Sequence, residues 1–170
     1  MAYSRWCRGL IASLSCCILT ACIPVFSYPR FWDFTRTKPQ DSDSVGNYKV
    51  LTLRLTDKQR RLVGSDLRIT LRRDHSAELI GIPEFDSFGE GLECVMSGTA
   101  TWKLDGDGWG WNVWFENYHA TNRGAADECK WENSTWEGSL ILGRPAHYRL
   151  YEYVGDPDSD TGIEFQRFAK

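Results

Sequence analysis

Side chains that could carry out chemistry are few and scattered in this chain of 170 residues. Its three histidines, His75, His119 and His147, lie far apart, and their neighbours do not have the spacing of zinc ligands. None of its serines has the glycine context of a nucleophile elbow. We therefore expect no metal site, no cofactor and no catalytic serine.

Carboxylates are more numerous, and they concentrate in the connecting segments. Two carboxylates flanking one bond are the machinery of glycoside hydrolysis, but no spacing here singles out such a pair. Residues 156–162 imitate the start of a calcium loop, yet Thr161 stands where that loop requires glycine. The loop acids considered are Glu84, Asp86, Glu90, Glu93, Asp127, Glu128 and Glu132. We expect no enzyme, and a carboxylate-based hydrolase is the second alternative.

The most distinctive stretch is residues 97–116, which reads as two strands joined by the turn Asp105-Gly106-Asp107-Gly108. Asp-Gly supplies the positive φ that a hairpin turn needs. Since strand side chains alternate between faces, one face of the second arm is almost entirely aromatic. Its members are Trp109, Trp111, Val113 and Phe115. Such a face is either a packed core or the wall of a ligand site, and we expect Trp111, nearer the strand centre, to be core.

The elements that must position these residues are almost all strands. Short alternating segments separated by turn residues predict an all-β fold of eight antiparallel strands in an up-and-down meander. Eight such strands can close into a lipocalin-like barrel, and a twisted open sheet or sandwich is the alternative. One turn or two of peripheral helix is expected at 57–63. The strands are expected at about 46–55, 67–71, 77–82 (stopped by Pro83), 96–104, 109–116, 135–142, 148–154 and 162–168.

The connections alternate between long and tight. In a meander, alternate connections lie at opposite ends. The longer ones, 56–66, 83–95, 117–134 and 155–161, should gather at one end, which we name the mouth end. The tight ones, 73–76, 105–108 and 143–147, should gather at the other, which we name the tight-turn end.

The first 22 residues resemble the precursor of a bacterial lipoprotein. Arg5 and Arg8 form a basic region, residues 9–19 form a short apolar region, and Leu19-Thr20-Ala21-Cys22 matches a lipobox. The resemblance implies that a helical signal segment, 1–21, is cleaved and that Cys22 carries lipid. It also implies a location in the bacterial cell envelope, at the outer membrane if there are two membranes and otherwise at the outer face of the plasma membrane.

The remaining chain is expected to divide into a flexible tether, 22–44, and one β-barrel domain, 45–170. Prolines and the polar end Asp41-Ser42-Asp43-Ser44 favour the tether, although Phe31, Trp32 and Phe34 are apolar enough to pack on the domain or to enter the lipid interface. The formal charge is −3 and becomes −5 without residues 1–21, which hold two arginines and no acid. We therefore expect no nucleic-acid partner and no charge-driven attachment to anionic lipid.

If Cys22 is lipidated, the processed chain keeps one pair of cysteines, Cys94 and Cys129. Both fall at the mouth end of the expected meander, and an oxidising compartment favours a disulfide. We expect this bridge, with two free thiols as the alternative.

The part of the chain from Val45 onward resembles a group of small uncharacterised bacterial envelope proteins of lipocalin-like type. The resemblance rests on Ser97-Gly98-Thr99-Ala100-Thr101-Trp102-Lys103-Leu104 and on residues 150–159. It departs from the expected pattern at Glu152, where an apolar residue would suit the core better. The resemblance supplies no catalytic residue.

Two binding functions lead. The first is a non-enzymatic lipoprotein whose barrel binds a small apolar or aromatic molecule through Trp109 and Trp111, with Glu152 nearby. The alternative is a protein-protein interaction module, such as an inhibitor or immunity protein, that offers acidic mouth loops to a basic partner.

Overall fold

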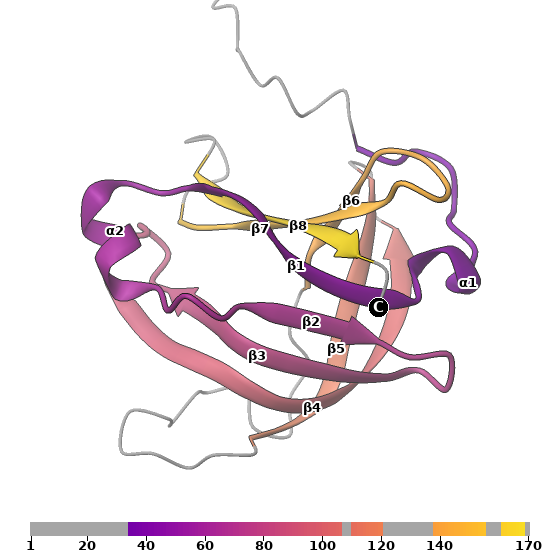
Figure 1. Ribbon diagram of the computed structural model, residues 1–170, viewed down its shortest axis with the longest axis horizontal. Helices are drawn as coiled ribbons and strands as arrows, with labels where there is room; N and C mark the ends of the chain where they lie inside the picture. Colours follow the sequence, from indigo (N-terminus) through magenta and orange to yellow (C-terminus); the bar gives the residue numbers. More distant parts are fainter. Residues whose placement is uncertain (1–33, 107–109, 121–137, 156–160, 169–170) are drawn as a thin grey trace, which may run out of the picture.

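The protein is a closed barrel of eight antiparallel strands, each paired with the next in sequence and β8 paired with β1 (Figure 1). The computed structural model describes residues 34–106, 110–120, 138–155 and 161–168. The predicted all-β meander and its closure are both confirmed. The strands are β1 (Gly46–Arg54), β2 (Arg68–Leu71), β3 (Ser76–Phe85), β4 (Leu92–Gly106), β5 (Trp111–Ala120), β6 (Leu140–Leu142), β7 (Arg149–Tyr153) and β8 (Gly162–Phe168).

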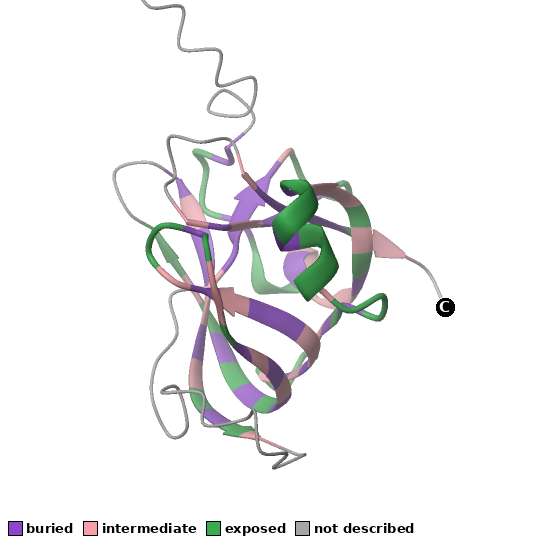
Figure 2. Ribbon diagram, turned by 90° about the vertical axis from the view of Figure 1, so that its left-hand side faces the viewer, coloured by how far each residue is buried: buried purple, intermediate pink, exposed green. Residues whose placement is uncertain are grey.

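Side chains fill the interior of the barrel. Along β4, Met96, Ala100 and Trp102 are buried while Thr99 and Thr101 between them are exposed, and the same alternation of colours is visible along the strands in Figure 2. Eight strands enclose a space that inward side chains can just occupy. The bulkiest of the fully buried members of this inner core are Tyr48, Phe115, Tyr118 and Phe165.

A second, smaller apolar cluster lies on the outer face of β6 and β7. Leu140, Leu142 and Tyr151 alternate with inner-core residues of the same strands, so they point outward. Phe34 packs against them and forms a bridge with Leu142. The segment predicted to be a tether is therefore docked on the barrel wall from Phe34 onward.

The structure corrects two strand ends. We expected Pro83 to stop the third strand, but β3 continues to Phe85, with Pro83 opposite Val95. The register shifts just before it, between Leu79 and Ile82, and proline is tolerated beside such a bulge because the ladder of hydrogen bonds is already interrupted there.

The fifth strand was expected to end at Glu116, yet β5 runs to Ala120. Asn117 has a φ of 53°, and the register with β4 shifts between Thr99 and Thr101. Asn117, in the left-handed conformation, accommodates the extra residue at this shift, and the pairing of β5 with β4 then resumes. The sixth strand was expected from residue 135, and β6 begins at Leu140; residues 135–137 lie outside the described part.

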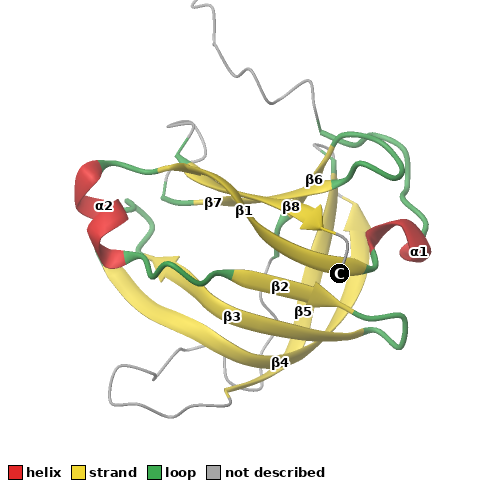
Figure 3. Ribbon diagram, viewed as in Figure 1, coloured by secondary structure: helices red, strands yellow, loops and turns green. Residues whose placement is uncertain are grey.

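One short helix lies at each end of the barrel (Figure 3). Helix α2 (Asp57–Leu62) was predicted, and it begins with a capping box in which Thr56 and Gln59 satisfy each other's backbone N–H groups. Helix α1 (Asp41–Ser44) lies at the opposite end, where the Tyr48 hydroxyl donates to the Ser44 carbonyl at 2.6 Å. Neither helix approaches the length and apolar character needed to span a bilayer, within the ranges that the structure covers.

Contacts between loops confirm that the two kinds of connection separate. At the mouth end, the Gln59 side chain donates to the carbonyl of Gly89 at 2.6 Å, which joins α2 to the β3–β4 loop. Gly155 of the β7–β8 turn packs so closely on Gly89 that an added Cβ would lie 2.7 Å from its nitrogen. At the tight-turn end, Asp41 of α1 lies 3.4 Å from His75 in the β2–β3 turn.

Candidate functional site

The aromatic face of β5 belongs mainly to the core. Val113 and Phe115 are fully buried. Trp111 shares their face, but it is the first residue of the strand and is only half-buried, with the ammonium of Lys38 5.5 Å from the centre of a ring. The expectation that Trp111 is core is thus met only in part, because it packs on the edge of the core at the tight-turn end. Trp109 lies outside the described residues.

Glu152 lies on the inward face of β7, as its sequence position suggested. It lies two residues after the inner-core residue Leu150 and therefore on the same face, and its carboxylate accepts a hydrogen bond from the Ser139 hydroxyl at 3.0 Å. Ser139 is itself buried, at 1% exposure, whereas Glu152 keeps partial contact with solvent. The hydrogen bond and this solvent access explain how a carboxylate fits where an apolar residue was expected.

The cysteine predictions depend on segments that the structure does not describe. Cys94 is buried in β4, at 5% exposure. Cys129 and Cys22 both lie outside the described residues, so the bridge and the lipidation stay predictions.

The histidines are separated as the meander predicted. His75 stacks on the ring of Trp102, with 4.9 Å between ring centres, and its Nδ1 lies 3.1 Å from the Trp102 carbonyl oxygen. His147 lies in the β6–β7 turn at the same end, whereas His119 lies near the mouth end of β5. Within the described ranges, no three potential ligands cluster closely enough to hold a metal ion.

One candidate contact surface is the β3–β4 loop at the mouth end, which is held by hydrogen bonds of its own. The carboxylate of Asp86 accepts hydrogen bonds from the backbone N–H groups of Phe88, Glu90 and Gly91, at 2.8–3.1 Å. Backbone bonds from Gly89 to Asp86 and from Asp86 to Gly91 close the same turn. These donors, that of Glu90 most strongly, hold the pKa of the Asp86 carboxyl below its ordinary value.

This loop presents Phe88 to solvent with 83% of its surface exposed. An aromatic side chain held outward by a fixed turn is unusual, because large apolar side chains normally find cover. Sequence reasoning noted the acids of this loop but missed Phe88. The signal was present in Asp86-Ser87-Phe88-Gly89, where aspartate opens a turn and a glycine with a φ of 69° follows the aromatic residue.

Charge at the mouth end is mixed rather than purely acidic. Exposed Glu90 and Glu93 lie on the β3–β4 loop and the start of β4. Helix α2, beside this loop, carries exposed Lys58 and Arg61. The acids at 127, 128 and 132 lie outside the described residues. The acidic character that we expected therefore belongs to the β3–β4 loop and not to the whole described end.

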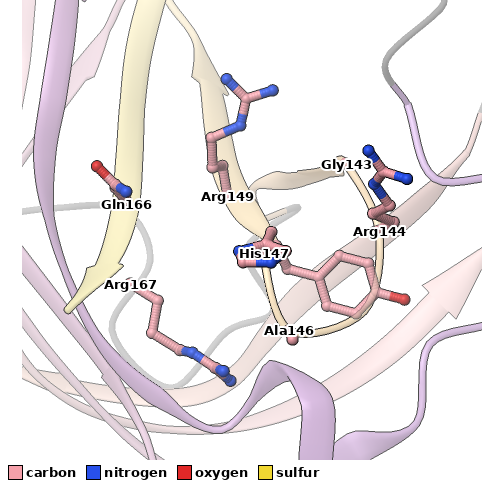
Figure 4. A pocket seen from close by; sticks show the side chains of 8 residues that line it. Gly143, Arg144, Ala146, His147, Arg149, Gln166 and Arg167 are labelled. Atoms are coloured by element: carbon pink, nitrogen blue, oxygen red, sulfur yellow. The ribbon is translucent and has the colours of Figure 1, made fainter. Parts of the chain in front are cut away.

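The tight-turn end has a hollow of about 400 Å³ between the β6–β7 turn and the end of β8 (Figure 4). The turn follows a type II pattern: Pro145 is at its second position, Ala146 at its third has a φ of 68°, and the His147 N–H donates to the Arg144 carbonyl. The lining is rich in cations and amides: Gly143, Arg144, Ala146, His147, Tyr148, Arg149, Gln166 and Arg167.

Comparisons of the chain with models of protein families, with curated proteins and with solved structures find no match.

Proposed function

We propose that this protein is a non-enzymatic, lipid-anchored protein of the bacterial envelope whose barrel presents its mouth end to a partner protein. The observation that carries the binding part is Phe88, 83% exposed on a loop that the Asp86 carboxylate holds in place. Aromatic side chains are enriched among the few interface residues that dominate binding energy. A loop that is already ordered loses little conformational entropy when a partner binds.

The charges around Phe88 indicate which kind of surface the partner should have. Glu90 and Glu93 are exposed near it, and the pKa of Asp86 is lowered, so this loop stays anionic at neutral pH. The proposed partner is a protein with an apolar socket for the phenyl ring and basic residues around that socket. Binding of this kind should weaken as salt is added, because ions screen exposed charges.

Substitution of Phe88 tests the contact against a matched exposed residue. A photo-crosslinking side chain at position 88 identifies the partner in intact cells, and the purified partner is then titrated. Phe88→Ala should weaken binding by about thirtyfold or more, since hot-spot truncations cost roughly 2 kcal/mol or more. Leu51→Ala, at a residue 48% exposed in β1, should leave binding unchanged. Equal losses in both variants, or none in either, would contradict the proposal.

The anchoring part rests on Leu19-Thr20-Ala21-Cys22 and its resemblance to a lipobox. Acyl chains on one cysteine would hold a negatively charged domain that charge alone would not. Cys22→Ser should release the protein from the membrane fraction. A Cys22→Ser protein that still carried lipid would rule out this assignment.

We also propose the bridge between Cys94 and Cys129, which would close a loop of about 35 residues near the proposed contact surface. In the chain-entropy model such a loop contributes roughly 3–4 kcal/mol. Alkylation of the unreduced protein should detect neither thiol, and labelling of Cys94 would exclude the bridge.

A small apolar or aromatic ligand bound through Trp109, Trp111 and Glu152 is the second candidate. It is favoured by the half-buried ring of Trp111 and by the inward carboxylate of Glu152. Side chains of the inner core fill the space between Trp111 and Glu152, so this ligand hypothesis has less support than the contact surface at the mouth end. Melting of the protein with and without envelope extract tests it: a rise in the parent that is lost in Trp111→Ala would favour the ligand over the partner.

A further inference from the structure

Basic side chains gather around the hollow at the tight-turn end. Arg149 is partly neutralised by Glu164, whose carboxylate lies 2.5 Å from its guanidinium and is 2% exposed. Arg167 donates to the backbone carbonyls of Asp43 and Val45. Arg144 is exposed on the turn itself. These partners fix the positions of Arg149 and Arg167, so cations are in excess in the lining of the hollow itself.

The arginines do not converge on one point. Figure 4 shows the guanidinium groups of Arg149 and Arg167 on opposite sides of His147, with Arg144 across the turn from both. One compact anion cannot touch all three groups in this arrangement. A surface that carries many separate anionic groups can, because each guanidinium then meets its own partner.

The route of the chain links this surface to the expected anchor. The Thr35 N–H donates to the Ile141 carbonyl at 3.0 Å, and the Thr35 hydroxyl donates to the carbonyl of Gly143, which lines the hollow, at 2.8 Å. Eleven residues lie between Cys22 and Phe34, so twelve steps of the chain join the two. At roughly 3.3–3.6 Å per residue they reach about 40 Å at most. A lipid on Cys22 would therefore hold the tight-turn end within about 40 Å of the membrane.

Further cations lie on the same side. Arg36 and Lys38 are exposed in the segment that leads to α1, and Arg73 is exposed in the β2–β3 turn. Exposed Asp41, Asp74 and Asp105 at the same end offset part of this charge. Net charge predicted no attraction to anionic lipid, but a membrane feels only the charges within about one Debye length, roughly 8 Å. The positions of the cations therefore decide whether the protein is attracted to an anionic membrane, and its net charge does not.

We propose that the tight-turn end docks on the phosphate-bearing headgroups of an anionic membrane, with Arg144 and its neighbours in contact with the lipid phosphates. The proposal rests on the proposed lipid anchor for its geometry. Docking would orient the barrel, so that the mouth end and Phe88 point away from the membrane. Basic side chains near an anionic surface each add to its attraction, and the effect falls with salt.

Acetylation of two lysines in the same molecule tests the orientation. The protein from its own envelope is reconstituted into zwitterionic vesicles or into vesicles containing anionic phospholipid, and treated with a water-soluble acylating reagent. Lys38, at the tight-turn end, should react on the order of threefold more slowly in anionic vesicles. Lys58, exposed on α2 at the mouth end, should react equally in both. Strong salt should remove the difference.

Matched charge reversals identify the surface. Arg144→Glu should abolish most of the protection of Lys38, while Arg61→Glu on α2 should leave it intact. Melting temperatures of both variants should match the parent, because both side chains are exposed. The proposal would be overturned if anionic vesicles did not protect Lys38, or if they protected Lys58 equally. It would also be overturned if Arg144→Glu and Arg61→Glu had equal effects on the protection of Lys38. Protection of Lys38 by inorganic phosphate in zwitterionic vesicles would overturn it in favour of a free anion.

The same experiment distinguishes a failure of the proposed lipid anchor from a failure of the proposed docking surface. A protein without lipid would not float with zwitterionic vesicles. It would then be mixed with excess anionic vesicles and footprinted in the same way, so that the docking surface is judged apart from the anchor.

Discussion

The two ends of the barrel are closed by different interactions. At the tight-turn end, Trp102 is 2% exposed, stacks on His75, and donates its indole N–H to the Arg72 carbonyl at 2.9 Å. At the mouth end, Leu55, Phe85 and Val154 are also buried, and the loops beyond them are joined by hydrogen bonds from Gln59 to Gly89 and from loop N–H groups to Asp86. Packing buries apolar surface, whereas hydrogen bonds can shape a loop and leave its apolar side chain exposed. The mouth end thus carries an exposed apolar side chain on a shaped loop, whereas the large ring at the tight-turn end, that of Trp102, is covered.

The largest expected effect is at the packed end. Trp102→Ala removes a buried ring and should lower the free energy of unfolding by about 3–5 kcal/mol. Urea denaturation measures this loss. Trp102→Phe is the control, since it keeps most of the volume and removes the N–H that bonds Arg72. A loss below about 1 kcal/mol in Trp102→Ala would show that packing does not close this end.

A smaller effect is expected for Trp111, which lies at the edge of the same core. Truncation to alanine should cost about half of what Phe115→Ala costs, because Trp111 is half-buried and Phe115 is fully buried. Both variants are compared with the parent by urea denaturation. Equal losses would mean that Trp111 is a full member of the core.

At the mouth end, Gln59→Ala should cost about 1–2 kcal/mol, the sum of one hydrogen bond and part of a helix cap. Thr56→Ala separates the contribution of the helix cap from that of the hydrogen bond, since it disrupts the cap and keeps the hydrogen bond from Gln59 to the Gly89 carbonyl. Hydrogen exchange of the α2 amides and of Gly89 should report the change locally. If Gln59→Ala cost as much as Trp102→Ala, the contrast between the ends would disappear.

The smallest effect is a dependence on pH. The pKa of Asp86 is lowered first by the Glu90 N–H, and that of Asp74 in the β2–β3 turn by Ser76. A lowered folded-state pKa gives stability that is present above the unfolded value, about 3.9, and is lost as pH falls through the folded value. Thermal melting between about pH 5 and 2 should therefore show a shallower decline in Asp86→Asn and in Asp74→Asn. Curves parallel to that of the parent would refute this account.

The barrel could be predicted because strand alternation and turn residues are local. The alternation of Leu67, Ile69 and Leu71 needs no knowledge of distant contacts. The turn expected from Asp105 to Gly108 was placed too early, because Asp105 and Gly106 belong to β4 and pair with Asn112 and Trp111. The number of strands and the lengths of their connections favoured closure, with an open sheet or sandwich as the alternative, and the pairing of β8 with β1 decided between them.

The remaining features depend on contacts between distant segments. Gln59 belongs to a helix expected to be peripheral, and only the fold brings it 2.6 Å from the Gly89 carbonyl. Phe34 gained a defined role because β6 and β7 offer an outward apolar cluster that alternation alone did not reveal. The hollow beside Arg144 forms from a turn and a strand end far apart in sequence.

The attachment of Thr35 to β6 has a mechanical consequence. A pull on the amino-terminal segment enters the barrel at a strand of three residues, through the bonds to Ile141 and Gly143. Among the described residues, β6 joins β5 through a single register pair and one further backbone bond, whereas β4 and β5 share eight register pairs. Tension from a moving membrane would therefore peel the barrel open at the seam between β5 and β6, and force spectroscopy should find rupture beginning there.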